Sequence, residues 1–240
     1  MKLKKLFRRK QKDPHCSVVV VAAGSSERMG GDKMLMTLGA KPVIIRTLMA
    51  FQKSPMVDDI VVVTKMEKIT AIADMIKLYD ITKVTQVISG GATRGESSLA
   101  GVSAVRRGAK LIAIHDGARP LVSQELIERV VKEANEHFSA VPVLPSTDTL
   151  KRVDSRGVIV EGVDRASVFR VQTPQVFDAD IIKGALTKAV EKRLPITDDC
   201  SAVDMMGFST YTVEGDAGNI KLTLPEDMVL AEAILKSRGE

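Results

Sequence analysis

Small residues and two cations follow directly on an apolar run near the start of the chain. The run SVVVVAAGSSERMGGDK extends from Ser17 to Lys33, and its valines and alanines predict a strand that is buried on both faces of a sheet. Small residues from Gly24 onward let the backbone approach a ligand closely, and exposed N–H groups in such a loop form a concave anion site. Arg28 and Lys33 add two positive charges. The stretch indicates a phosphate-binding loop, although strand, glycine and loop also follow one another in α/β proteins of other functions.

Two further ionisable residues stand where chemistry is expected. Asp116 follows the apolar segment Lys110–Ile114, within the sequence IHDGARP. A carboxylate at the end of a buried strand can hold Mg²⁺ together with phosphate oxygens; the alternative is an aspartate that caps a turn. Lys221 lies between Ile220 and Leu222. A lysine there costs desolvation energy unless it faces an anion, or it extends its ammonium group to solvent.

Two other motifs are less specific. The segment SGGATRGESS joins a predicted strand to a predicted helix, and it could hold a base or ribose through the backbone groups of Gly90, Gly91, Arg94 and Ser97. On spacing alone, an ordinary strand-to-helix turn is the better interpretation. Asp178-Ala179-Asp180 spells the DxD of metal-dependent glycosyltransferases, but it opens a helix, so we interpret Asp178 or Asp180 as the helix N-cap.

Composition narrows the class of protein. Hydrophobic residues make up 45% of the 240 residues, which is ample for the core of one α/β domain. Residues 1–13 hold seven Lys or Arg and one Asp, a net charge of +6, whereas the whole chain carries +5. The remainder is therefore close to neutral at −1, which argues against nucleic-acid binding by the domain. No apolar run is long enough to span a bilayer.

Strands and helices must alternate to bring these loops together. We expect a basic tail at 1–16, which we predict to be disordered, and a single domain at 17–240. Buried strands are predicted at 17–23, 59–64, 83–88, 110–114 and 139–144, and a later strand at 207–213. Helices are predicted at 41–53, 67–78, 124–137, 180–192 and 225–236, and a helix after residue 98. This alternation predicts a mostly parallel α/β sheet whose ligand lies at the carboxyl ends of the strands. Polar, alternating residues at 145–165 predict a β-hairpin.

Several motifs together resemble one enzyme family. The run from Ala22 to Lys33 resembles the AAGxxxRMxxxxK signature of sugar-phosphate nucleotidyltransferases. IHDGARP, DTLKR, TPQVF, TDD and NIKLTLPEDM follow in order, and with them the chain from Ser17 to the last helix is similar to the 2-C-methyl-D-erythritol 4-phosphate cytidylyltransferase family. The resemblance implies a Rossmann-like, mostly parallel sheet with helices on both faces, a protruding β-arm and a homodimer. It also implies Mg²⁺-dependent transfer of the cytidylyl group of CTP to methylerythritol phosphate.

The resemblance assigns roles to individual residues. The catalytic residues it implies are Arg28, Lys33 and Lys221. The nucleotide-binding residues are Ala22, Ala23, Gly24, Gly91, Ser97 and Asp116, of which Asp116 also holds the metal. Thr149 and Arg165 are implied to bind the phosphate of the second substrate. The sequence departs from the family at Ala92, where relatives often carry an acidic residue, in the short loop before Lys33 and in the basic tail.

Two other functions remain open on the sequence. A cytidylyltransferase for another polyol phosphate, such as ribitol 5-phosphate, shares almost every motif. A nucleotide-binding module without turnover is the second alternative, but binding alone would not require three cations around one phosphate. Cys16 and Cys200 form no CxxC motif, which favours a reducing, cytoplasmic location. We expect no nucleic-acid or membrane partner.

Overall fold

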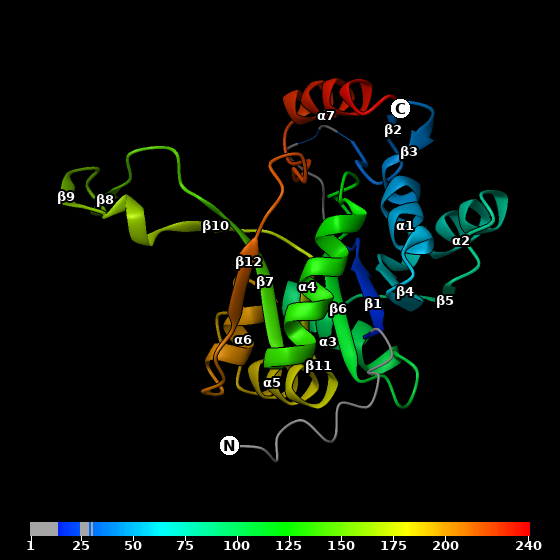
Figure 1. Cartoon of the computed structure of the whole chain (residues 1–240), viewed down its shortest axis with the longest axis horizontal. Coiled ribbons are helices and arrows are strands. Elements are labelled where there is room, and N and C mark those ends of the chain that lie inside the picture. Colours follow the sequence, from blue (N-terminus) through cyan, green and yellow to red (C-terminus); the bar gives the residue numbers. More distant parts are fainter. Residues whose placement is uncertain (1–13, 25–28, 30) are drawn as a thin grey trace, which may run out of the picture.

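A single mixed sheet forms the centre of the described chain (Figure 1). The computed structural model describes residues 14–24, 29 and 31–240. The expectations for residues 1–13 of the tail and for residues 25–28 and 30 of the predicted phosphate-binding loop, Arg28 among them, therefore fall outside the described residues. Four neighbouring strands run parallel in the order β6 (Leu111–Asp116), β1 (Cys16–Val21), β4 (Val57–Thr64) and β5 (Val84–Ser89). Cys16, which was assigned to the tail, is the first residue of β1.

The other half of the sheet contains the antiparallel pairs. Next to β6 lies β11 (Gln175–Asp178), which is antiparallel to both β6 and β7 (Ser139–Pro145). β10 (Phe169–Val171) also pairs antiparallel with β7, whereas β12 (Tyr211–Glu214) pairs parallel with it. The sheet is therefore mixed, with the parallel half on the side of β1.

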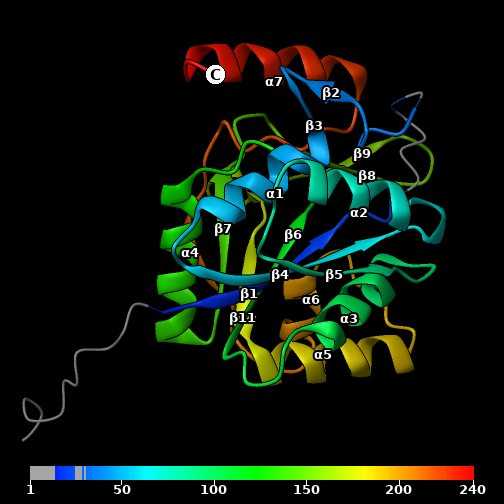
Figure 2. The same ribbon diagram turned by 90° about the vertical axis from the view of Figure 1, so that its right-hand side faces the viewer.

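Helices cover both faces of the sheet, as Figure 2 shows. α1 (Val43–Lys53), α2 (Ile69–Leu78) and α4 (Gln124–His137) pack on one face. α3 (Arg94–Ala104), α5 (Ala179–Glu191) and α6 (Asp199–Asp204) pack on the other. Val18 and Val20 of β1 belong to the first core and Val19 to the second, so β1 is buried on both faces. The predicted α/β fold is confirmed.

The last helix and a short hairpin close one end of the molecule. α7 (Pro225–Ser237) buries Ala231 and Leu235 in the first core and lies against β2 (Thr37–Leu38). β2 pairs with β3 (Lys41–Pro42), which leads directly into α1. A helix was predicted to start at Lys41, but it starts at Val43 because residues 41–42 are taken up by this pairing.

The predicted hairpin at 145–165 is present and stands away from the sheet (Figure 1). β8 (Lys151–Val153) and β9 (Ile159–Gly162) form a two-stranded antiparallel sheet of their own. The turn closes where Gly157 N donates to Asp154 O at 3.0 Å. We call residues 145–165 the arm. A short 3-10 helix (Arg165–Ser167) leads from the arm back to β10.

Two helix starts test the interpretation of polar residues. Asp178 Oδ1 accepts from the backbone N–H groups of Asp180 and Ile181, so the N-cap reading of the DxD sequence is confirmed. α6 was not predicted. The Gln175 side chain accepts from the N–H groups of Asp199 and Cys200, and this partner lies more than twenty residues away in the sequence.

The strand predicted at 207–213 is shorter in the structure, because β12 begins only at Tyr211.

We also asked whether any helix could cross a membrane. Among the residues described, none of the helices combines the length and the apolar character that crossing a bilayer requires.

A glycine sets the distance between α3 and the sheet. A Cβ atom on Gly101 would lie 2.2 Å from Val19 Cγ1 and 2.8 Å from Val63 Cγ2. We expect Gly101→Ala to lower the free energy of unfolding by about 1–3 kcal/mol, because the added methyl group overpacks this contact. Urea unfolding followed by circular dichroism would measure the change.

Gly184 offers the matched control. It lies on the exposed side of α5, and a Cβ atom there would meet nothing within 4 Å. Gly184→Ala should therefore leave stability unchanged or raise it by up to about 1 kcal/mol. Equal effects of the two substitutions would contradict the proposed close contact at Gly101.

Candidate active site

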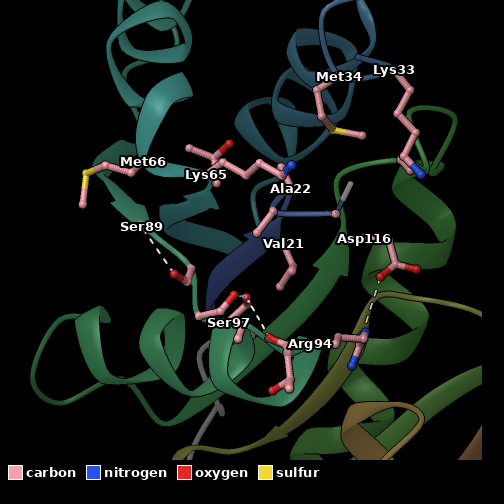
Figure 3. A pocket seen from close by; sticks show the side chains of 18 of the residues that line it. Val21, Ala22, Lys33, Met34, Lys65, Met66, Ser89, Arg94, Ser97 and Asp116 are labelled. Atoms are coloured by element: carbon pink, nitrogen blue, oxygen red, sulfur yellow. Dashed lines mark hydrogen bonds and ion pairs between the residues drawn. The ribbon is translucent and has the colours of Figure 1, made fainter. Parts of the chain in front are cut away.

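The loops that follow the four parallel strands line one pocket (Figure 3). Its volume is about 660 Å³. Most of its wall comes from the carboxyl ends of β1, β4, β5 and β6, with contributions from α3 and from the segment before α7. The described lining residues are Val21, Ala22, Ala23, Gly24, Lys33, Met34, Thr64, Lys65, Met66, Glu67, Ser89, Gly90, Gly91, Ala92, Thr93, Arg94, Ser97, Asp116, Ala118 and Lys221.

One carboxylate gathers the cations of this pocket. Asp116, the last residue of β6, is only 8% exposed. Lys221 Nζ lies 2.9 Å from its Oδ2, and Arg94 Nη2 and Arg119 Nε each lie 3.6 Å from one of its oxygens. Burial alone would raise the pKa of Asp116, but Lys221, Arg94 and Arg119 hold that pKa well below its usual range. Asp116 is therefore a carboxylate at any ordinary pH.

Arg94 is fixed from behind by a second carboxylate. Its Nη2 lies 2.6 Å from Asp199 Oδ2, and the Asp199 side chain is completely buried. Burial raises the pKa of Asp199 although the charge of Arg94 opposes the shift. Burial would lower the pKa of Arg94, but the charges of Asp199 and Asp116 raise it. Arg94 thus stays charged and is held between two carboxylates, with one of them at the pocket.

A buried histidine links the elements beneath Asp116. His115 Nε2 lies 3.1 Å from Arg119 O, and because a carbonyl only accepts, Nε2 carries the proton. Nδ1 then accepts from the Thr173 hydroxyl at 3.0 Å, and Thr173 Oγ1 accepts from the Asp116 N–H at 3.1 Å. Burial lowers the pKa of His115 to about 4, so the ring is neutral at neutral pH. This chain of bonds fixes the backbone that carries Asp116.

The loops after β1 and β5 approach each other closely. Ala22 N donates to Val63 O, and Gly90 N donates to Thr64 O, so β4 ties both loops together. A Cβ atom on Gly90 would lie 2.6 Å from Ser97 Oγ and 2.9 Å from Ala23 Cβ, which requires glycine here. Ser97, almost fully buried in α3, donates to Thr93 O at 3.0 Å.

Lys33 and Lys221 come to the pocket from distant parts of the chain. Lys33 Nζ donates to Leu222 O at 3.1 Å, which joins the segment after β1 to the segment before α7. Lys221 faces Asp116, so the expectation that this lysine meets an anion is met by a carboxylate of the protein itself. It lies in an irregular segment, outside the helices and strands.

The structure therefore assembles most, but not all, of the residues singled out in the sequence. Those that line the pocket are Lys33, Lys221, Ala22, Ala23, Gly24, Gly91, Ser97 and Asp116. Arg28 lies outside the described residues. Thr149 and Arg165 lie on the exposed arm, away from the pocket of their own chain. Arg165 Nη1 instead donates to Thr147 O at 3.1 Å, beside a separate surface hollow.

Sequence reasoning missed two residues that hold this arrangement. Arg94 was considered only for its backbone, in a segment that could hold a base or ribose or form an ordinary turn, and Asp199 only as part of a motif. They are 105 residues apart, and no local pattern pairs them. Arg119 was visible in the motif HDGARP, yet its contacts with Asp116 and with Asn219 O depend on the tertiary fold.

A metal ion would find a single carboxylate at the centre of this pocket. No group of three or more potential metal-binding side chains occurs within the described chain. The carboxylates that line the described pocket are Asp116 and Glu67. Mg²⁺ is commonly held by one or two carboxylates and by substrate phosphates rather than by a complete protein cage, so Asp116 fits this mode of binding.

Comparisons with known proteins agree on one family. Residues 16–237 match the family model described as 2-C-methyl-D-erythritol 4-phosphate cytidylyltransferase. The protein of that name from Halalkalibacterium halodurans is 38% identical over 224 residues, which is 92% of this chain and 97% of the relative. The solved structure of that enzyme from Thermus thermophilus is 32% identical, with a TM-score of 0.77 over 92% of this chain and 99% of the other. 4-Diphosphocytidyl-2C-methyl-D-erythritol synthase from Anaerococcus prevotii is 27% identical, with a TM-score of 0.83 over 94% and 100% of the chains.

The buried histidine makes stability depend on pH. The pKa of His115 falls from about 6.5 when unfolded to about 4 when folded. Between these values the unfolded chain binds the extra proton, so we expect the free energy of unfolding to fall as the pH is lowered. From pH 7 to pH 5 this group should contribute a loss of about 2 kcal/mol. Urea titrations at both pH values would measure it.

His115→Gln provides the comparison, because glutamine takes up no proton in this range. The variant should be less stable than the parent at pH 7 but should lose about 2 kcal/mol less on acidification. Parallel losses in both proteins would show that His115 is not the group responsible.

Proposed function

Because the chain belongs to the 2-C-methyl-D-erythritol 4-phosphate cytidylyltransferase family, we propose that the pocket at the ends of β1, β4, β5 and β6 is its active site. The enzyme transfers the cytidylyl group of CTP to 2-C-methyl-D-erythritol 4-phosphate in isoprenoid biosynthesis by the non-mevalonate route. The observation that carries the assignment is the convergence of Lys33, Lys221 and Arg94 beside Asp116 in one pocket.

The proposed reaction requires stabilisation of negative charge at the α-phosphorus and does not require a general base. In this proposal the phosphate of methylerythritol phosphate attacks the α-phosphorus of CTP in line, and pyrophosphate leaves. The nucleophile is already anionic, so catalysis rests on positioning and on cations around the phosphorus. Lys33 and Lys221 are the proposed catalytic residues, together with Arg28. The support is that both described lysines line the pocket at its Asp116 end.

The nucleotide is proposed to lie across the loops after β1 and β5. Ala22, Ala23 and Gly24 would contact the nucleotide from one loop, and Gly91 and Ser97 from the other. Small residues in both loops support this role, because the backbone there can approach a ligand closely. At Ala92 the pocket wall carries only a methyl group, so no side-chain hydrogen bond to the nucleotide is expected from that position.

Asp116 is the proposed ligand of Mg²⁺. When bound, Mg²⁺ would neutralise charge on the phosphate oxygens of CTP. Asp116 would hold it through a carboxylate oxygen, since a carboxylate accepts at both of its oxygens. Lys221 and Arg94, which contact Asp116 in this structure, would then be available to the phosphates.

A homodimer would complete the site for the second substrate. The arm exposes Val153, Val158, Ile159 and Val160 by 50–63%, which is unusual for aliphatic side chains on one small hairpin. An isolated two-stranded hairpin is marginally stable in water, and twofold dimers are the commonest oligomers. We propose that each arm packs against a second copy of the chain and brings Thr149 and Arg165 to the pocket of that copy.

We also place the enzyme in the cytoplasm. Cys16 and Cys200 are both free thiols, and burial raises the pKa of Cys16 to about 12. A reducing compartment suits two thiols that are not paired with each other.

A panel of polyol phosphates tests the proposed reaction. With CTP and Mg²⁺, we expect methylerythritol phosphate to be turned over far faster than ribitol 5-phosphate, as measured by pyrophosphate release.

Lys221→Met should lower turnover by about 100- to 1000-fold, because it removes a cation from the transferred phosphate. Lys183→Met, on the exposed side of α5, is the control and should behave as the parent. Faster turnover of ribitol 5-phosphate would contradict the assignment of methylerythritol phosphate as the substrate. Absence of turnover with every polyol phosphate would contradict the proposed function.

Subunit complementation tests the shared site. Lys221→Met and Arg165→Met homodimers should each be nearly inactive. After subunit exchange, a heterodimer would contain one site with both substitutions and one with neither. Its activity should return to as much as about half of the parent value if the two sites act independently. Absence of recovery, once exchange is demonstrated by differently tagged chains, would mean that each chain completes its own site.

A further inference from the structure

A lysine that has no assigned role points into the pocket from the end of β4. Lys65 follows the last residue of β4 directly and is half-buried. Figure 3 shows its side chain extending toward the middle of the pocket. Its ammonium group has no hydrogen-bond or ion-pair partner among the described residues, whereas Arg94 and Lys221 both contact Asp116. A partly desolvated cation without a partner at a ligand pocket favours a ligand that accepts hydrogen bonds.

The order of the strands fixes which end of the nucleotide Lys65 meets. The strand ends follow one another as β6, β1, β4 and β5, about 5 Å apart. Asp116 marks the phosphate end, at β6. Lys65 stands two strands away, about 10 Å along the edge. It lies between the loop after β1 and the loop after β5, which β4 ties together through Val63 O and Thr64 O.

A nucleotide that reacts beside Asp116 extends its ribose and base away from that end. This argument rests on the proposed function, because it takes the reacting phosphorus to lie beside Asp116. We propose that Lys65 donates a hydrogen bond to the carbonyl O2 of the pyrimidine base and so contributes to the choice of nucleotide. Adenine has no carbonyl group, so Lys65 favours a pyrimidine over adenine at this position.

Lys65→Met tests the inference, because methionine keeps the length of the stem and removes the charged donor. A hydrogen bond from a charged group to the base binds ground state and transition state alike. We expect the KM and the dissociation constant for CTP to rise about tenfold with kcat within about twofold of the parent. Inhibition by pyrophosphate and by ATP should be unchanged, since neither offers a pyrimidine O2. Lys77→Met, an exposed lysine of α2, is the matched control and should leave every constant unchanged.

Each other outcome identifies a different contact and overturns this one. Weaker inhibition by pyrophosphate in Lys65→Met would place Lys65 at the phosphates. An equal loss for CTP and ATP with pyrophosphate unchanged would place it at the ribose. Unchanged CTP binding would remove Lys65 from the nucleotide site altogether. Because CTP binding is measured directly by calorimetry, these outcomes are distinct from a failure of the proposed function, which would appear as absent turnover in the parent enzyme.

Discussion

The parallel pairing of four strands is the constraint on which the rest of this structure depends. β6, β1, β4 and β5 point the same way, so their four carboxyl ends lie along one edge and every following loop opens there. β1 is buried on both faces and is paired along both edges, with β4 on one side and β6 on the other, and these pairings hold it in register. A linear order of chemical groups results, from the carboxylate and cations at β6 to Lys65 at β4. That order is a property of the sheet, and the substrate has to conform to it.

The positive and negative charges at the carboxyl ends of the strands balance one another in the protein without a substrate. Asp116 is surrounded by Lys221, Arg94 and Arg119, and Asp199 neutralises Arg94 from the buried side. Without the two carboxylates, several cations would be crowded into one half-buried pocket, and their mutual repulsion would favour unfolding or displacement of the side chains. An incoming triphosphate can replace Asp116 as the partner of these cations. The protein carboxylates therefore hold these cations together at the pocket in the absence of a ligand.

Sequence reasoning correctly predicted the features that are determined by residues close together in the chain. The valine run gave β1, the Asp178 carboxylate was identified as a helix cap, and the alternating polar residues gave the hairpin of the arm. Two of its failures, at α6 and at Arg94, involve a partner that is remote in the sequence. α6 begins where Gln175 satisfies its first N–H groups, and Arg94 is held by a carboxylate 105 residues away. Thr149 and Arg165 are a different case, because the sequence resemblance assigns them to an arm that serves a second copy of the chain, and they do not line the pocket of their own chain.

The contact between Arg94 and Asp199 also bears on the conformational entropy of binding. An arginine side chain that is free in solution loses rotamer freedom worth up to about 2 kcal/mol when it is immobilised. For Arg94 this loss occurs when the chain folds, since the 2.6 Å contact with Asp199 already fixes its guanidinium group. Lys65 is half-buried but has no such contact among the described residues, so it keeps more rotamer freedom than Arg94 before a ligand binds. The two cations therefore contribute differently to affinity even if their hydrogen bonds to a ligand are equally strong. In the proposed site Arg94 would bind as a rigid group, whereas Lys65 would give up part of its interaction energy to become ordered.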